Sequence, residues 1–211
     1  MIPFQTVTGI AVPYDAANVD TDQLVPARFL MKPRAYDYGK LLFHDLRFGP
    51  RAVPQFPLDS PVYKGARIMV TGANFGCGSA REQAAYALKD FGIVSVVGPS
   101  FGDIFRTNCV KNGILLAQVE ADIAALLRAS LHVLPGAMLT IDLERQTITQ
   151  SDGSEIRFAI SEADRDQLLS GKDDITRTLQ HEDVILAFER EYIANNKWNP
   201  AAIARPGEAK Q

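Results

Sequence analysis

The middle of the chain alternates between short apolar runs and amphipathic stretches. The runs RIMVT, IVSVV and ILLAQV are rich in β-branched residues and nearly continuous, which is typical of parallel strands buried on both faces. Helical periodicity separates them, at residues 80–90 and 101–111. This order predicts a parallel βαβαβ core whose sheet is covered by helices on both faces.

The flanking segments extend this α/β core. TGIAVPYD, residues 8–15, predicts a first strand that runs into an Asp-rich loop at residues 15–22. A further helix is expected beyond Glu120, and residues 137–160 then alternate and turn at Asp152-Gly153, which predicts a hairpin. Helical patterns follow at residues 161–171 and 182–193. We expect one α/β domain, residues 1–194, and a C-terminal tail, residues 195–211.

Residues 28–64 form a long stretch without regular periodicity, in which prolines and aromatic residues are frequent. Loops of this length in a compact domain are usually functional or disordered. The aromatic content argues against plain disorder. We interpret this stretch as a flap or an interface.

Composition and charge narrow the classes of function. The 211 residues are 46% hydrophobic and 22% charged, as in ordinary soluble globular proteins. The net charge of −3 leaves no evident basic face, which argues against nucleic-acid binding. No apolar run is long enough to span a bilayer, and the N-terminal segment lacks the features of a secretory signal. We expect a cytoplasmic protein that binds neither nucleic acid nor a membrane.

The chain has two cysteines, Cys77 and Cys109, too few for a disulfide scaffold or a complete iron–sulfur site. Cys109 shares the apolar face of its predicted helix with Phe101, Ile104 and Phe105, which indicates a core cysteine. Cys77 lies in a glycine-rich turn and is interpreted as a small buried residue rather than a nucleophile. The three histidines lack ligand spacing, so we expect no metal in this chain.

The glycine-rich turn is VTGANFGCGSAREQ, residues 70–83. It is not a Walker A loop, because Ser79 and Ala80, with no lysine, follow Gly78. It is a weak dinucleotide fingerprint, because Arg81 stands where a third glycine is needed. Glu82 follows Ser79 by three residues, which predicts a capping box worth about 1 kcal/mol at the start of a helix.

Arg81 suggests that the turn does more than cap a helix. A cation in the first helical turn is unfavourable, because it meets the positive end of the helix dipole. Beside glycines, free backbone amides and the Ser79 hydroxyl, its guanidinium makes a pocket for a carboxylate. A surface ion pair with Glu82 or Asp90 is the alternative, and both interpretations stay open here.

Several motifs in order resemble the aconitase superfamily. NFGCGSAREQ, residues 74–83, is similar to the Gly-x-Gly-Ser-Ser-Arg-Glu-His motif of its swivelling domain. Three further segments resemble small subunits of 3-isopropylmalate dehydratases: NVDTDQLVPARFL (18–30), GPSFGDIFRTNCVKNGILL (98–116) and ITRTLQHEDVILAFE (175–189). The resemblance runs from Gly9 to about Glu189. It implies a swivelling β/β/α domain of the aconitase type, with a parallel βαβαβ core, an added hairpin and C-terminal helices.

The resemblance also implies a hydro-lyase that is active only as a heterodimer with a large subunit. That partner would carry a [4Fe–4S] cluster, and the pair would interconvert 2- and 3-isopropylmalate through 2-isopropylmaleate in leucine biosynthesis. The Ser79 alkoxide would be the catalytic base, stabilised by the amides of Gly78 and Ala80. Arg81 would bind a carboxylate of the small di-acid substrate.

Two other segments are assigned roles by the same resemblance. Thr21 and Asp22 match a segment beside the active site and would orient the Ser79 loop or the substrate, with a simple Asx-turn as the alternative. FLMK, residues 29–32, aligns with a loop that sets substrate choice in this family. Met31 is apolar and suits a branched alkyl group better than a third carboxylate, which favours isopropylmalate over homocitrate or citrate.

Two positions depart from the family motif. Ala80 replaces its second serine, and Gln83 replaces its histidine and cannot titrate. These changes leave open a related hydro-lyase acting on citraconate, methylmalate or dimethylmaleate. A non-catalytic anion-binding module and an interaction protein that docks a partner through residues 28–64 also remain open.

Overall fold

The computed structural model describes residues 2–49, 52–78 and 81–196. Contacts group the chain into two compact units, Met1–Gly171 and Lys172–Gln211. The expected extent of the domain, residues 1–194 followed by a tail, stays a prediction. Of that tail, residues 197–211 lie outside the described residues.

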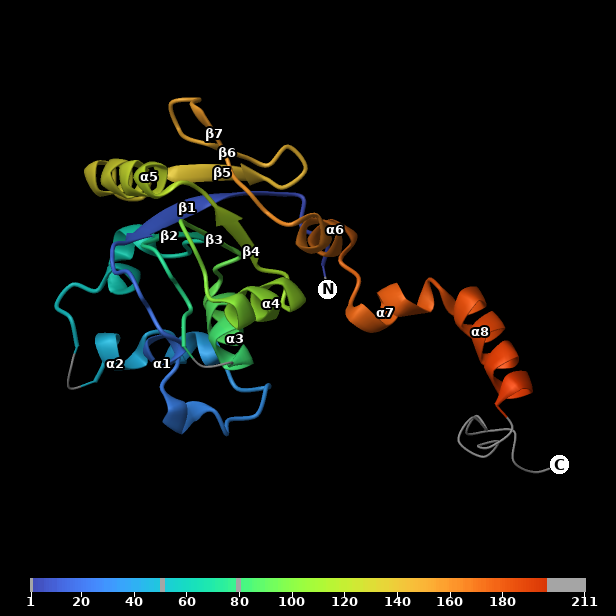
Figure 1. Cartoon of the computed structure of the whole chain (residues 1–211). Helices are drawn as coiled ribbons and strands as arrows, with labels where there is room; N and C mark the ends of the chain where they lie inside the picture. The colour runs from blue at the N-terminus through green and yellow to red at the C-terminus, as the bar shows by residue number, and fades with distance from the viewer. Residues whose placement is uncertain (1, 50–51, 79–80, 197–211) are drawn as a thin grey trace. The chain divides into compact units, whose positions relative to one another are not determined.

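A mixed seven-stranded sheet lies at the centre of the first unit, as far as the described residues define it (Figure 1). The strand order is β4-β3-β2-β1-β5-β6-β7. Pairing is parallel from β4 to β1 and antiparallel from β1 to β7, which confirms the predicted parallel core and added hairpin. The strands are β1 (Thr6–Tyr14), β2 (Ile68–Thr71), β3 (Ser95–Gly98), β4 (Leu115–Gln118), β5 (Met138–Asp142), β6 (Thr147–Thr149) and β7 (Glu155–Arg157).

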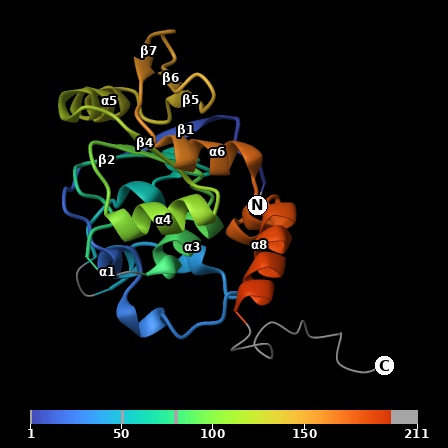
Figure 2. The ribbon, with the colours of Figure 1, turned by 45° about the vertical axis from the view of Figure 1, so that its right-hand side comes forward.

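Helices cover both faces of this sheet (Figures 1 and 2). Helices α3 (Glu82–Phe91) and α4 (Asp103–Lys111) lie side by side on one face, and α5 (Ala121–Val133) lies on the other. The first unit also contains α1 (Thr21–Leu24), α2 (His44–Arg47) and α6 (Glu162–Ser170), and the second contains α7 (Asp174–Leu179) and α8 (Glu182–Asn195). Among the described residues no helix has both the length and the apolar character needed to cross a membrane.

Successive strand residues point into two different hydrophobic clusters. Met69 and Val96 join the cluster under α3 and α4, whereas Ile68 and Val97 join the cluster under α5. Because both faces of the parallel strands are buried, their sequences are continuously apolar rather than alternating.

Cys109 is completely buried in the cluster under α3 and α4, which confirms the expected core cysteine. Phe101 and Phe105 are buried in the same cluster. Ile104 was expected on this face but is 51% exposed, so that expectation was wrong. The helix begins at Asp103, and Ile104 is turned away from Phe105 and Cys109 by the helical rotation.

The irregular stretch at residues 28–64 packs onto the same cluster. The 3-10 turn η2 (Tyr38–Leu41) lies against α3, and Tyr38, Phe43 and Phe56 are buried. The Phe43 ring is centred 4.9 Å from that of Tyr14 in β1 and 5.3 Å from that of Phe56. Core packing therefore accounts for these three aromatic residues of the stretch, whereas Phe48 is 58% exposed.

Candidate active site at the carboxyl edge of the parallel strands

Three loops meet where the parallel strands end. They follow β1, β2 and β3 and comprise residues 15–20, 72–78 and 99–102. Isolated backbone bridges join Asp20 to Cys77 and Phe75 to Phe101. The carboxyl ends of parallel strands form the edge at which open α/β sheets bind ligands. Most of the residues singled out from the sequence converge on this edge.

Backbone hydrogen bonds hold the glycine turn against the loop after β1. The amides of Gly76 and Cys77 both donate to the carbonyl of Val19, at 2.7 and 3.1 Å. The amide of Thr21 donates in return to the carbonyl of Cys77 at 3.0 Å. The two loops therefore form one rigid backbone assembly.

Gly76 and Gly78 both adopt left-handed backbone conformations, with φ of 74° and 85°. A Cβ atom at Gly76 would lie 2.2 Å from the ring of buried Phe105. Among the described residues beyond its chain neighbours, a Cβ atom at Gly78 would meet only the Cβ atom of Asp20, at 3.5 Å. Gly76 is therefore needed for packing, whereas Gly78 leaves its backbone open for the approach of a ligand.

Arg81 is the N-cap residue of α3, with an extended backbone (φ −124°, ψ 116°). The expected helix start at residue 80 was therefore wrong, and Arg81 does not lie in the first helical turn. Glu82 is the first helical residue rather than the third, so the predicted capping box does not describe this helix start. Ser79 and Ala80 lie outside the described residues.

The guanidinium of Arg81 forms an ion pair with Asp22 through Nη1. The Arg81 side chain is 16% exposed and that of Asp22 is 53% exposed. The alternative partners proposed from the sequence were wrong: Asp90 pairs with Arg34, and Glu82 accepts a hydrogen bond from Asn112. The Asp22 carboxylate offsets the unfavourable placement of a cation at the N-terminus of α3.

The Asp20-Thr21-Asp22 motif divides into a structural part and a part that contacts Arg81. Asp20 Oδ1 caps α1 by accepting the amide of Gln23 at 2.7 Å, three residues on, which is an N-cap bond. Thr21 is buried. The structure thus brings Asp22 to Arg81, while Thr21 contributes its backbone to the assembly with Cys77.

The segment Phe29–Lys32 lies beside the start of α3. Nε2 of Gln83 donates to the carbonyl of Leu30 at 3.3 Å, only two residues from Arg81. Met31 is 94% exposed. The predicted substrate-choice segment is therefore held near the predicted carboxylate-binding residue, with Met31 projecting into solvent.

A depression of about 600 Å³ opens beside Asp22. Asp20, Asp22 and Asp45 contribute to its wall, together with Arg28. Arg28 bonds to Asp45, and this contact lowers the pKa of that carboxyl to about 2. Three carboxylates against one guanidinium make the depression a poor site for a di-acid by charge alone.

The donor set of this chain does not fit an iron–sulfur cluster. Among the described residues no group of three His, Cys, Asp or Glu side chains is placed to hold a metal ion. Cys109 is buried, which raises the pKa of its thiol well above its usual range. Cys77 is partly exposed, so the expectation that it is buried was wrong, and it lies 32 residues before Cys109 in the chain.

Sequence patterns did not single out Arg128, a residue of α5 that contacts the starts of the loops after β1 and β2. Its Nε donates to Asp15 at 3.0 Å, and its Nη1 donates to the Thr71 carbonyl at 2.7 Å. His132 lies 2.7 Å from the other oxygen of Asp15. Asp15 follows β1 and Thr71 ends β2, so one side chain holds the bases of the two site loops. No short-range signal reveals a contact between residues 113 positions apart.

Comparison with protein-family models finds two matches. Residues 1–122 match the Aconitase C-terminal domain family, and residues 125–162 match a family described as LeuD_N. The first match alone spans more than half of the chain.

Curated relatives match over nearly their whole length. The chain is 46% identical over 213 residues to a 3-isopropylmalate dehydratase small subunit of Rhodospirillum rubrum, with 97% of this chain and 100% of that protein covered. It is 44% identical over 200 residues to the protein of the same name from Paramagnetospirillum magneticum, covering 94% and 100%.

Among solved structures, a crystal structure of 3-isopropylmalate dehydratase (leuD) from Methanocaldococcus jannaschii matches with a TM-score of 0.62. The two chains are 24% identical, and the match covers 87% of this chain and 99% of that one. The likeness supports the swivelling α/β fold.

Proposed function

This chain belongs to the family of 3-isopropylmalate dehydratase small subunits, and on that premise we propose how its own residues serve the reaction. It is a subunit of a hydro-lyase of leucine biosynthesis. The enzyme dehydrates 2-isopropylmalate to 2-isopropylmaleate and adds the water back to give 3-isopropylmalate. The glycine turn and Arg81 form this chain's half of the active site.

The observation that carries the proposal is the Arg81–Asp22 pair, three residues along the chain from Gly78, where the described residues leave room for a ligand. A guanidinium has five N–H donors, and the pair with Asp22 uses Nη1. The remaining donors are suited to a substrate carboxylate without loss of that pair. Asp22 orients Arg81, Thr21 holds the turn through its backbone, and Met31 contacts the isopropyl group.

Ser79 is the base in this proposal. It follows Gly78 directly in the sequence and precedes Arg81 by two residues. Its Oγ takes the proton from the carbon next to the carboxylate that Arg81 binds. The amides of Gly78 and Ala80 stabilise the alkoxide, and their partial positive charge adds to that of the nearby N-terminus of α3.

The partner is the large subunit, because a small subunit implies one. Because two cysteines are too few for a [4Fe–4S] cluster, the partner would hold it, and there it would supply Lewis acidity toward the departing hydroxyl. This chain binds and orients the di-acid and moves the proton. We further propose a cytoplasmic heterodimer that has no nucleic-acid or membrane partner.

The first test is an anaerobic assay that follows the absorbance of 2-isopropylmaleate. The chain is measured alone and then mixed with a cluster-bearing large subunit. Activity only in the mixture supports the proposal. Activity of the chain alone contradicts the division of labour. A mixture that forms a complex with an intact cluster but turns over only citraconate, methylmalate or dimethylmaleate corrects the substrate.

Two substitutions test the assigned roles in the assembled enzyme. Ser79→Ala should abolish turnover while leaving the binding of a di-acid inhibitor within about twofold. Arg81→Met should raise the KM by about tenfold to a hundredfold, because it removes a charge-assisted contact to a carboxylate. Arg28→Met is the matched control, since Arg28 also pairs with an aspartate beside the same depression. An equal effect of both arginine variants would refute the role of Arg81.

A further inference from the structure

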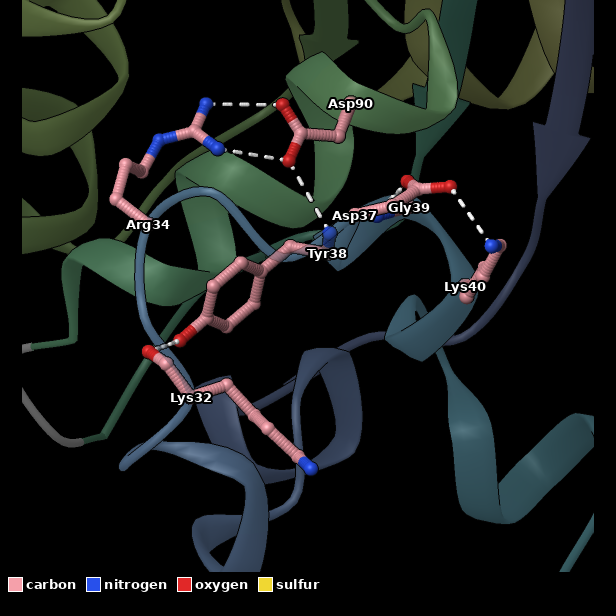
Figure 3. A network of polar contacts seen from close by, with 7 residues as sticks. All are labelled: Lys32, Arg34, Asp37, Tyr38, Gly39, Lys40 and Asp90. Carbon is pink, nitrogen blue, oxygen red and sulfur yellow. Dashed lines mark hydrogen bonds and ion pairs between the residues drawn. The ribbon is translucent and has the colours of Figure 1, made fainter.

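The segment Phe29–Lys32 is held by polar contacts to its carbonyl groups. The buried side chain of Tyr38 donates its hydroxyl to the Lys32 carbonyl at 2.7 Å (Figure 3). Gln83 donates to the Leu30 carbonyl from α3. The carbonyls on both sides of Met31 therefore have partners, while the Met31 side chain is 94% exposed.

Asp90 connects this segment to α3. Its two oxygens accept Nη1 and Nη2 of Arg34, each at 2.9 Å, and Oδ2 also accepts the amide of Tyr38 at 3.1 Å (Figure 3). The guanidinium of Arg34 in addition lies 4.3 Å from the centre of the Tyr86 ring, on the same helix. Asp90 therefore holds two residues that flank or bind the segment: Arg34 lies two residues after its end, and Tyr38 binds its last carbonyl.

The position of Asp90 is unfavourable for α3 itself. Asp90 lies in the last turn of the helix, where the dipole disfavours an acid by a few tenths of a kcal/mol to about 1 kcal/mol. A carboxylate that accepts three hydrogen bonds offsets this cost. Its contacts serve the 29–38 stretch rather than the helix.

One rigid helix thus positions two parts of the proposed site. Arg81 caps the N-terminus of α3, and Asp90 stands in its last turn. We propose that Asp90, acting through Arg34 and Tyr38, is a positioning residue that sets the distance between Arg81 and Met31. This distance determines which side group the enzyme accepts on a di-acid whose carboxylate is held at Arg81. The inference rests on the proposed function and adds the device that fixes substrate choice.

The test uses Asp90→Asn in the assembled enzyme with its large subunit. Two quantities are measured: the KM for 2-isopropylmalate, and the inhibition constant of 2-methylmalate, which has the same carboxylates but a single methyl group. Asparagine cannot form the charged two-point contact with Arg34, so Met31 is no longer held at a fixed distance from Arg81. We expect the KM for 2-isopropylmalate to rise about tenfold, as for loss of apolar contacts in a specificity pocket. The inhibition constant of 2-methylmalate should change less than about twofold.

Two further variants make the test specific. Asp37→Asn is the matched control, because Asp37 contacts Gly39 and Lys40 in the same stretch but no residue of the segment (Figure 3). It should leave the ratio of the two constants unchanged. Tyr38→Phe removes only the hydroxyl that binds the Lys32 carbonyl and keeps the buried ring. It should shift the ratio in the same direction as Asp90→Asn.

The outcomes separate the positioning role of Asp90 from the proposed function. If the wild-type enzyme does not turn over 2-isopropylmalate, the proposed function fails. If the wild type is active but Asp90→Asn changes both constants by the same factor, the positioning role of Asp90 is refuted and the proposed function stands. Unchanged ratios in both Tyr38→Phe and Asp90→Asn would likewise refute the positioning role of Asp90 and leave the proposed function standing. A changed ratio in Asp37→Asn would show that the effect is general to this stretch and would also refute the role of Asp90.

Discussion

Alanine substitutions at three glycines separate backbone strain from packing in the glycine turn. Gly65, Gly76 and Gly78 all have a left-handed backbone, with φ of 77°, 74° and 85°. An alanine costs about 1–2 kcal/mol in this conformation wherever it stands. The three sites differ in what the new methyl group meets. Counting only the part of the chain that the structure describes, nothing lies within 4 Å of a methyl group at Gly65, and one atom lies at 3.5 Å at Gly78.

Gly76→Ala adds a steric cost to the backbone cost. The methyl group would lie 2.2 Å from Phe105, which is 2% exposed and packs against Phe75 at 5.7 Å between ring centres. Overpacking of a core costs about 1–3 kcal/mol. We therefore expect Gly76→Ala to lose about 2–5 kcal/mol and Gly65→Ala only about 1–2 kcal/mol.

Urea unfolding of the isolated subunit, followed by far-UV circular dichroism, measures this difference. With a slope of about 2 kcal/mol per M, the extra loss at Gly76 lowers the midpoint by about 0.5–1.5 M relative to Gly65→Ala. Midpoints that agree within about 0.3 M would refute the packing argument. Gly78→Ala should unfold like Gly65→Ala but lose activity in the assembled enzyme, because its methyl group faces the approaching substrate. Full activity in Gly78→Ala would contradict that placement.

Three further predictions concern residues around the site. Arg128→Met removes the donor of the Thr71 carbonyl and one of the two contacts of Asp15. It should cost about 1–3 kcal/mol in urea unfolding and lower kcat, whereas Arg145→Met, which breaks an exposed pair with Glu155, should cost less than about 1 kcal/mol. Equal losses would contradict the role of Arg128. The pKa of Asp45 is lowered from 3.8 to about 2 by Arg28, so its stabilising contribution is present above about pH 4 and is lost as the pH falls through about 2. The stability difference between wild type and Asp45→Asn should therefore shrink between pH 4 and pH 2, and a constant difference would count against this pair. A thiol reagent should label Cys77 in the native subunit and Cys109 only in denaturant; rapid labelling of both thiols would contradict the burial of Cys109.

The regular elements were predictable because their signals are local. Continuous apolar runs marked β2, β3 and β4, and the Asp152-Gly153 turn marked the hairpin between β6 and β7. The start of α3 was not predictable from the same signals. The sequence is suited to a capping box at Ser79, but the helix begins at Glu82. Arg81 has an extended backbone, and its side chain pairs with Asp22, which lies 59 residues earlier in the chain.

The remaining features depend on contacts between distant segments. The aromatic residues at 28–64 suggested a flap because nothing nearby in the sequence buries them. Tyr38, Phe43 and Phe56 are buried in the cluster that also contains residues of β1 and α3. Arg128 and Asp90 look in the sequence like any charged residue of a helix. Their partners Thr71 and Arg34 lie 57 and 56 residues away. Ser79, Arg81 and Asp22 were identified through the motif resemblance, and the structure adds only that Asp22 and Arg81 meet.

The position of β1 in the sheet has a consequence for how the chain acquires its fold. β1 is made first, yet it is the strand that joins the parallel and antiparallel halves, pairing with β2 on one side and β5 on the other. Thr6 meets Asp142, so the second edge of β1 has no partner until the chain has been made as far as β5, about 136 residues further on. Pairings this distant in sequence are slow to form, and an unpaired apolar strand attracts other chains. The nascent subunit therefore passes through a prolonged interval in which β1 must be shielded from aggregation.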